Sequence, residues 1–204
     1  KYEALVRLHD RNGQILCPGA FLDIIKPTAH YGRLTRRVFD LALEAARRTG
    51  SQISVNLSAI DLADGETYAY LLERLEQHEG ERLTFEITES EAIKDFARVR
   101  AFTEDIRRYG AQLAVDDFGS GYSNLATLVE LSPDYLKLDG SLVTKVVRED
   151  KVRRVVAAVV HFAHETEMQV VAEFVSTPEL ARCLTELGVD FLQGYAVGKP
   201  VPLP

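Results

Sequence analysis

Residues 111–124, AQLAVDDFGSGYSN, combine a short apolar run with two adjacent carboxylates and a glycine-rich turn. The run follows Gly110 and stops at turn residues, which is typical of a strand covered on both faces in a parallel sheet. Asp116 and Asp117 would be costly to bury at its end unless their charge is compensated, and a divalent cation is the usual partner. Considered alone, the stretch would more often be a solvated acidic turn, because buried carboxylates are rare.

The same arrangement recurs along the chain at intervals of 30 residues. Glycines at positions 50, 80 and 110 each precede a strand pattern, and a polar residue follows each glycine six positions later. These polar residues are Asn56, Glu86 and Asp116. The repeat predicts successive βα units that carry a polar side chain at the same depth of each strand.

Further strand and helix patterns surround these units. We expect strands at residues 2–9, 14–16, 53–57, 83–87, 113–117, 135–139, 169–173 and 189–194, and helices at 20–30, 34–48, 90–106, 152–163 and 177–187. In the strand at 135–139, Lys137 and Asp139 share one face because side chains alternate. No glycine-rich dinucleotide fingerprint follows the first strand, and polar residues end many different strands. The pattern therefore predicts a single α/β domain and favours a TIM-like barrel over an open sheet.

Composition limits the class of protein and its partners. The net charge of −7 argues against non-specific DNA binding, because a field of that sign repels polyanions. No stretch has eighteen consecutive apolar residues, and the first residues lack a signal-peptide pattern, so we expect a cytoplasmic domain without a membrane span. Cys17 and Cys183 have no metal or redox spacing and are expected to be reduced thiols.

A barrel would gather the strand-terminal polar residues at one rim. They are Glu3, Asn56, Glu86, Asp116, Asp117, Lys137, Asp139, Glu173 and Gln193. Oxygen ligands without histidine or cysteine indicate a hard cation such as Mg²⁺, Mn²⁺ or Ca²⁺, and the surplus of carboxylates indicates two ions sharing Asp116. Two neighbouring ions suit phosphodiester hydrolysis, and Arg7 is placed to contact a phosphate.

Alternatives remain open from the residues alone. A single strand-terminal acid is more often a helix cap, and a strand lysine more often extends to solvent than acts in catalysis. Asn, Glu and Asp on successive strands followed by a lysine also suit Mg²⁺-assisted proton abstraction, as in enolase-like enzymes. Repetition of polar residues at one depth across several strands favours a shared site.

The motifs together resemble the EAL-domain phosphodiesterases of bacterial cyclic di-GMP signalling. The resemblance is carried by EALVR (3–7), NLS (56–58), FEITES (85–90), DDFGSGYS (116–123), LKLD (136–139), VAE (171–173), QGY (193–195) and KP (199–200). It implies a (β/α)₈ TIM-like barrel with a modified first strand, and two Mg²⁺ or Mn²⁺ ions that hydrolyse cyclic di-GMP to linear pGpG.

The resemblance also implies a role for each matching residue. The metal ligands would be Glu3, Asn56, Glu86, Asp116, Asp117 and Glu173, and the catalytic group would comprise Lys137, Glu173 and Asp139. Arg7 would bind a substrate phosphate, and Gln193 would bind substrate and support the water network. Glu89 would brace the loop from Asp117 to Ser123, which in the family takes part in metal binding and dimer contacts.

The chain departs from the family pattern after Glu173. Phe174-Val175-Ser176 stands where the family commonly has Gly-Val-Glu, so serine replaces a supporting carboxylate. The upstream strand with a glutamine-proline pair is absent from residues 1–204, which suggests an EAL-type domain lacking its first strand and fused to sensor or GGDEF domains. We expect a homodimeric enzyme. The alternative is a weak or inactive EAL domain that acts as a cyclic di-GMP receptor or protein-interaction module.

Overall fold

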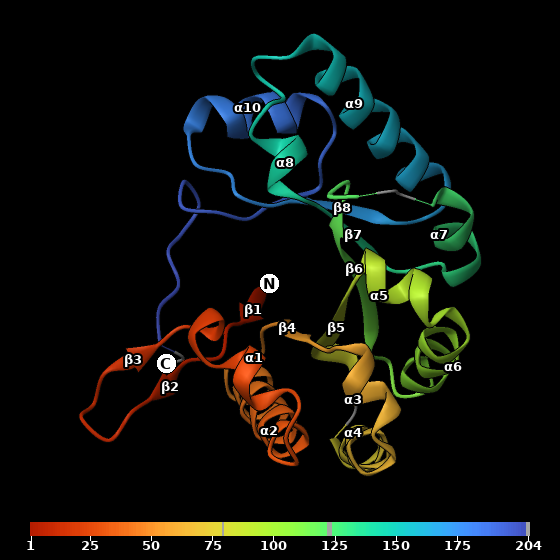
Figure 1. The fold of residues 1–204 in the computed structure, drawn as a ribbon. Coiled ribbons are helices and arrows are strands. Elements are labelled where there is room, and N and C mark those ends of the chain that lie inside the picture. Colours follow the sequence, from red (N-terminus) through yellow and green to blue (C-terminus); the bar gives the residue numbers. More distant parts are fainter. Residues whose placement is uncertain (79, 122–123, 203–204) are drawn as a thin grey trace. The chain divides into compact units, whose positions relative to one another are not determined.

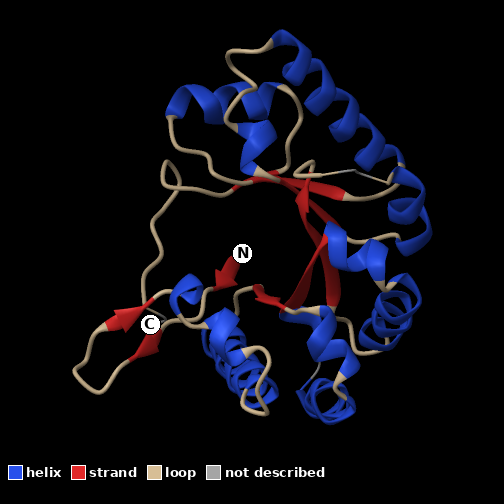
Figure 2. Cartoon of the chain, viewed as in Figure 1, coloured by secondary structure: helices blue, strands red, loops and turns tan. Residues whose placement is uncertain are grey.

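The computed structural model describes residues 1–78, 80–121 and 124–202, whose helices and strands are labelled in Figure 1. Within these residues, strands pair in the order β1-β4-β5-β6-β7-β8-β9, and the pairs β1–β4, β6–β7, β7–β8 and β8–β9 are parallel. The strands are β1 (Tyr2–Ala4), β4 (Ile53–Asn56), β5 (Leu83–Thr88), β6 (Gln112–Phe118), β7 (Tyr135–Leu138), β8 (Gln169–Ala172) and β9 (Phe191–Leu192). Alternation of these strands with helices confirms the predicted α/β class (Figure 2).

The helices lie mainly between consecutive strands of this sheet. They are η1 (Pro18–Ala20), α1 (Leu22–Ile25), α2 (Tyr31–Thr49), α3 (Ala59–Ala63), α4 (Gly65–His78), η2 (Gly80–Arg82), α5 (Glu89–Lys94), α6 (Phe96–Arg107), α7 (Leu125–Leu131), α8 (Gly140–Val143), α9 (Asp150–Glu165) and α10 (Pro178–Glu186). Among the described residues, no helix combines the length and apolar character that crossing a bilayer requires.

The chain divides into two compact units. The first contains residues 1–85 and 101–112, and the second contains residues 86–100 and 113–202. In the first unit, Phe85 of β5 stacks on Phe39 of α2 and meets Phe102 of α6 edge-on, with ring centroids 5.8 and 5.2 Å apart. Side chains alternate along β5, so the side chains directly before and after Phe85 point to the opposite face of the strand.

In the second unit, alternation separates an apolar face from a polar one. Leu136 and Leu138 of β7 are fully buried, while Tyr135 forms a small apolar cluster with Ala114 and Val171. Because side chains repeat every two residues, this cluster lies on the same strand faces as Asp116, Lys137 and Glu173, one layer further from the strand ends. The apolar cluster therefore lies directly beneath the polar site.

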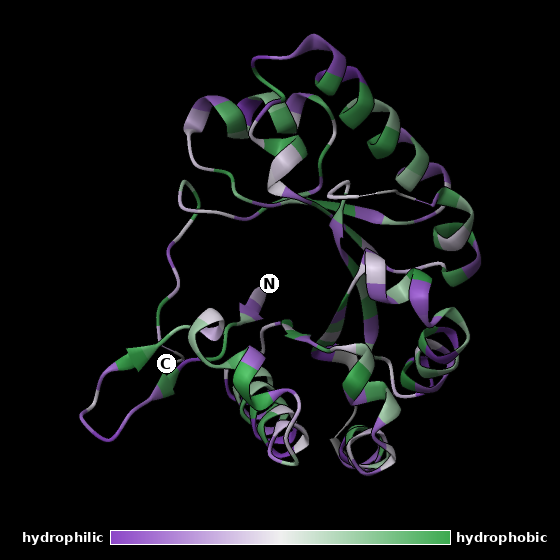
Figure 3. Ribbon diagram, in the orientation of Figure 1, coloured by the Kyte–Doolittle hydropathy of each residue, from purple (hydrophilic) through white to green (hydrophobic). Residues whose placement is uncertain are grey.

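The helix α9 shows how such a sheet is covered. Its residues Val156, Val160 and Ala163 are buried and recur at helical spacing, while Lys151, Arg154 and Glu165 are exposed, so the helix carries both hydrophobic and hydrophilic residues (Figure 3). An apolar stripe of this kind packs on a sheet and leaves the opposite face to water. The helix predicted at residues 152–163 is confirmed by α9.

Several predicted boundaries were wrong. The strand expected at 2–9 ends at Ala4, because Leu8–His9 (β2) pairs antiparallel with Ile15–Leu16 (β3) in a separate hairpin. The helix expected at 20–30 shortens to η1 and α1, since Pro27 lacks the N–H that a continuing helix needs. The helix expected at 90–106 divides at Asp95, which ends α5 and accepts the first backbone hydrogen bonds of α6. The short helices α7 and α8 were not predicted.

Candidate metal centre and active site

Lys137 of β7 occupies the centre of the polar site. Its Nζ lies 2.5 Å from Glu86 Oε2 at β5, 3.1 Å from Asp116 Oδ2 at β6 and 2.8 Å from Glu173 Oε1 after β8. The side chains of Lys137 and Glu86 are each only 2% exposed. One ammonium among these carboxylates leaves excess negative charge, which a bound cation would offset.

Asp117 joins the cluster through an unusual backbone conformation. Consecutive strand residues normally point to opposite faces, but Asp117 has φ 58°, and the β6–β7 register shifts between Val115 and Phe118. Its N–H donates to Asp116 Oδ1 at 2.8 Å. A non-glycine residue in the left-handed region costs about 1–2 kcal/mol, and here the conformation lets both adjacent carboxylates serve one site.

Asp116, Asp117 and Glu173 have the geometry of a cation site. One carboxylate oxygen from each lies within 4.8 Å of the others. Oxygen ligands stand about 2.0–2.6 Å from Mg²⁺ or Ca²⁺, so ligands of one ion are separated by no more than about 5 Å. The donor set and its spacing therefore fit a hard divalent cation.

Glu3 and Asn56 meet in the first unit. They lie on the paired strands β1 and β4, and Asn56 Nδ2 donates to Glu3 Oε1 at 2.7 Å. The chain after Asn56 is fixed by Ser58 and Asp61, which form a capping box at the start of α3. The Asp61 carboxylate is 1% exposed and accepts from the N–H of Ser58 at 2.9 Å and the hydroxyl of Thr35 at 2.5 Å.

Asp61, which fixes the chain after Asn56, was not predicted from the sequence. The signal was present, because serine followed three residues later by an acid is a capping-box pattern.

Glu89 ties together the ends of the glycine-rich loop. It is 6% exposed at the start of α5, and its carboxylate accepts from the N–H of Gly119 at 3.3 Å and of Asn124 at 3.2 Å. Gly119 has φ +93°, and a Cβ there would come within 2.2 Å of Leu142 Cδ1, so glycine is needed at this position. Residues 122 and 123 of the predicted loop lie outside the described residues.

Asp139, at the end of β7, is the N-cap residue of α8. Its carboxylate caps α8 by accepting from the N–H of Ser141 at 2.9 Å. Partial burial raises the pKa of Asp139, but hydrogen bonds from Ser141 and Gly140 lower it more, so the pKa lies below its ordinary value.

Gln193 and Arg7 are held through backbone groups. The N–H of Gln193 donates to Ala172 O at 2.8 Å, and its carbonyl accepts from Val175 N at 3.0 Å, which fixes Gln193 beside the end of β8. The guanidinium of Arg7 donates to Val6 O at 2.8 Å. In sum, the second unit gathers Glu86, Asp116, Asp117, Lys137 and Glu173, and the first unit gathers Glu3 with Asn56.

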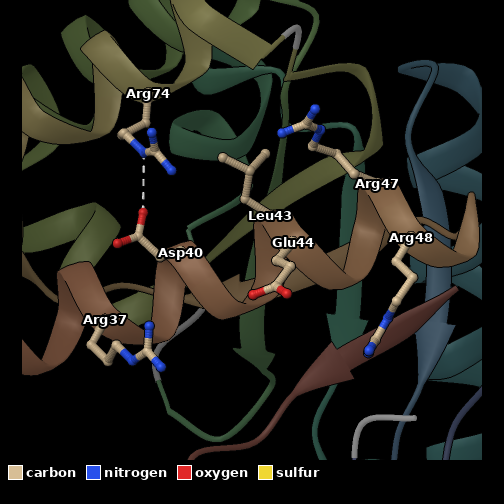
Figure 4. A pocket seen from close by; sticks show the side chains of 7 residues that line it. All are labelled: Arg37, Asp40, Leu43, Glu44, Arg47, Arg48 and Arg74. Atoms are coloured by element: carbon tan, nitrogen blue, oxygen red, sulfur yellow. Dashed lines mark hydrogen bonds and ion pairs between the residues drawn. The ribbon is translucent and has the colours of Figure 1, made fainter.

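A surface hollow of about 600 Å³ lies elsewhere, on α2 and α4 (Figure 4). Its lining residues are Arg37, Asp40, Leu43, Glu44, Arg47, Arg48 and Arg74. Arg74 Nε pairs with Asp40 Oδ1 at 3.1 Å. The hollow contains none of the predicted site residues, so its charged side chains form a solvated helix surface rather than part of the carboxylate site.

Comparison with known proteins identifies relatives across the whole chain. A model of the EAL domain matches residues 1–200. The cyclic di-GMP phosphodiesterase PdeF of Escherichia coli K12 is 30% identical over 99% of this chain, and the bifunctional diguanylate cyclase/cyclic di-GMP phosphodiesterase MucR of Pseudomonas aeruginosa is 30% identical over 98%. The chain spans 28% of the length of PdeF and 30% of MucR.

A solved structure has the same fold. The structure described as the PaMucR phosphodiesterase in complex with c-di-GMP is 31% identical and has a TM-score of 0.89, with 98% of this chain and 84% of that chain covered. This likeness confirms the predicted TIM-barrel-like fold class.

Proposed function

The chain belongs to the EAL domain family, and from this premise we propose that it is a metal-dependent phosphodiesterase that hydrolyses cyclic di-GMP to linear pGpG. The observation that carries the proposal is the cluster of Asp116, Asp117 and Glu173 beside the buried ammonium of Lys137. The names of PdeF and MucR support the choice of substrate.

We propose two Mg²⁺ or Mn²⁺ ions as cofactors. Asp116, Asp117 and Glu173 would hold one ion, since their oxygen atoms are suitably close. For the other ion, the ligands are those that the family resemblance implies, namely Glu3, Asn56, Glu86 and Asp116. When bound, the ions neutralise charge on the attacked phosphodiester and acidify a water molecule.

Residues of the chain then direct the transfer of a proton from the attacking water. The Glu173 carboxylate accepts the proton of the attacking water as a general base. Lys137 holds the carboxylates of Glu173 and Asp116 in place through ion pairs of 2.8 and 3.1 Å, which orients the Glu173 carboxylate. Arg7 is proposed to bind a phosphate oxygen, while Asp139 and Gln193 support the water network.

A second candidate function is a cyclic di-GMP receptor or protein-interaction module with weak or no turnover. The specific observation in its favour is Ser176, which is exposed and stands where the family resemblance places a glutamate. A missing supporting carboxylate would lower metal affinity or rate without removing the candidate ligands.

One experiment separates these functions. The purified chain is incubated with cyclic di-GMP in Mg²⁺, in Mn²⁺ and in chelator, and pGpG is quantified by chromatography. The proposal expects pGpG only with metal, and expects Glu173→Gln to abolish most turnover while retaining substrate binding. Glu179→Gln, at an exposed position in the first turn of α10, is the matched control and should be as active as the wild type.

Binding without pGpG at any metal concentration would favour the receptor. No binding and no turnover by folded protein would reject both functions.

We further propose that the domain works in the cytoplasm as a homodimer within a longer protein that carries sensor or GGDEF domains. The bifunctional name of MucR and the small share of that relative matched here support the longer protein. Light scattering of the purified chain across a concentration series tests the dimer, and a monomer mass at all concentrations would reject it.

A further inference from the structure

Phe174 follows Glu173 directly and has two unfavourable features. Its φ is +53°, in the left-handed region that bulky side chains rarely adopt. In addition, 61% of Phe174 is exposed, so its ring gains little from burial in the core. Glycine would satisfy this backbone conformation without strain, which means that neither the turn nor the core explains a phenylalanine here.

The surrounding backbone holds Phe174 in this conformation. The N–H of Glu173 donates to Leu138 O at 3.2 Å, and the N–H of Val175 donates to Gln193 O at 3.0 Å. Val175 is itself fully buried. Because the residues on both sides are fixed, Phe174 cannot relax to an ordinary φ, and strain maintained in this way is typical of functional positions.

The ring also has a defined seat. It packs against Gly140, the first residue of α8, where an added Cβ would come within 2.7 Å of Phe174 Cδ2 and 2.9 Å of Cγ. A side chain at residue 140 would displace the ring. The ring is thus held against bare backbone at one side while most of the residue remains open to solvent.

We propose that Phe174 is a specificity-determining residue whose ring stacks on a purine base of the dinucleotide substrate, an inference that rests on the proposed function. An exposed, pre-positioned ring one residue from Glu173 offers a flat apolar surface close to the proposed reacting phosphate. Purine bases stack on such rings, and loss of one stacking partner weakens binding roughly 5- to 150-fold. A base held in this way would orient the phosphodiester toward the carboxylates.

The test compares Phe174→Gly, Phe174→Leu and Phe174→Tyr with the wild type. Both Phe174→Gly and Phe174→Leu should raise KM for cyclic di-GMP about tenfold with a much smaller change in kcat, whereas Phe174→Tyr should stay within about twofold of wild-type KM. Phe174→Gly should also melt at or above the wild-type temperature, because glycine removes the backbone strain.

Glu167→Gly is the matched control. Glu167 is exposed at a turn with φ +62°, so its replacement also relieves strain but should leave KM unchanged. Wild-type KM in Phe174→Gly and Phe174→Leu would overturn the inference while the proposed function stands. If the wild-type chain binds cyclic di-GMP without turnover, the variants are compared with it by Kd instead of KM. A wild-type chain that neither binds nor hydrolyses cyclic di-GMP would overturn the proposed function and this inference together.

Discussion

Lys137→Met tests most directly whether the ammonium of Lys137 offsets the negative charge of the carboxylates around it. Methionine keeps the length of the buried side chain and removes its charge, so little of the effect comes from a cavity. The substitution leaves Glu86, Asp116 and Glu173 without the ammonium that lies 2.5–3.1 Å from them. Solvent screens this loss weakly, since the Glu86 side chain is only 2% exposed.

The expected effect is large compared with the stability of a domain. Removing one partner of a buried ion pair costs about 3–5 kcal/mol, against a typical unfolding free energy of about 5–15 kcal/mol. Urea unfolding followed by far-UV circular dichroism in chelator should show this loss. Glu86→Gln in the Lys137→Met background removes one of the uncompensated charges and should recover part of it.

Divalent metal supplies a second measurement on the same variant. Mg²⁺ or Mn²⁺ at about 100 times its Kd would restore about 2.7 kcal/mol if it binds the folded carboxylates and not the unfolded chain. Lys145→Met, at an exposed lysine, is the control and should stay within about 0.5 kcal/mol of the wild type. If Lys137→Met unfolds like the wild type in chelator, the ion pairs described here contribute nothing to stability and the reasoning is refuted.

Three further predictions concern the rim of the site. Glu89→Ala removes the acceptor shared by the N–H groups of Gly119 and Asn124, so the unfolding free energy should fall by about 1–3 kcal/mol in urea titrations. Turnover should fall with it. Wild-type values would show that these two hydrogen bonds are not needed to hold the loop. Asp139 has a pKa below its ordinary value, so its ionised form stabilises the fold above about pH 4 and that contribution is lost as the pH falls through the folded pKa. Thermal melts should therefore show Asp139→Asn less stable than the wild type at pH 7 and approaching it below about pH 4, and a pH-independent difference would contradict the assignment. Ser176→Glu should raise kcat in the pGpG assay if a missing carboxylate limits the rate, and an unchanged or lower kcat would remove that explanation.

The strands that carry the site were predictable because periodicity and charge agree on them. Alternation along β7 placed Lys137 on a face opposite to Leu136, and the structure confirms that separation. The orientation of Asp117 was not predictable in this way. Alternation would direct Asp117 away from Asp116, and only the left-handed backbone brings the two carboxylates together.

Most features that were not predicted are short elements or residues whose type fits more than one role. The four residues of α8 are too few to show helical periodicity, and Asp139 reads equally as a site residue or a cap. The strain at Phe174 does not follow from its residue type alone, because φ depends on the hydrogen bonds that neighbouring strands impose on either side. The conformation of Phe174 therefore depends on contacts between segments distant in sequence, whereas Asp139 caps the helix that directly follows it.

The buried lysine has a consequence for how the strands align during folding. Tyr135 pairs with Gln169 and Lys137 with Val171 in the β7–β8 register. A slip of one residue would turn Lys137 toward the helices and bring Leu136 or Leu138 among the carboxylates, while a slip of two would place Tyr135 or Asp139 there. A slip of one residue would bury the charge of Lys137 in an apolar layer, and a slip of either size would take it away from the acids, so the same ammonium also favours one alignment of the parallel strands.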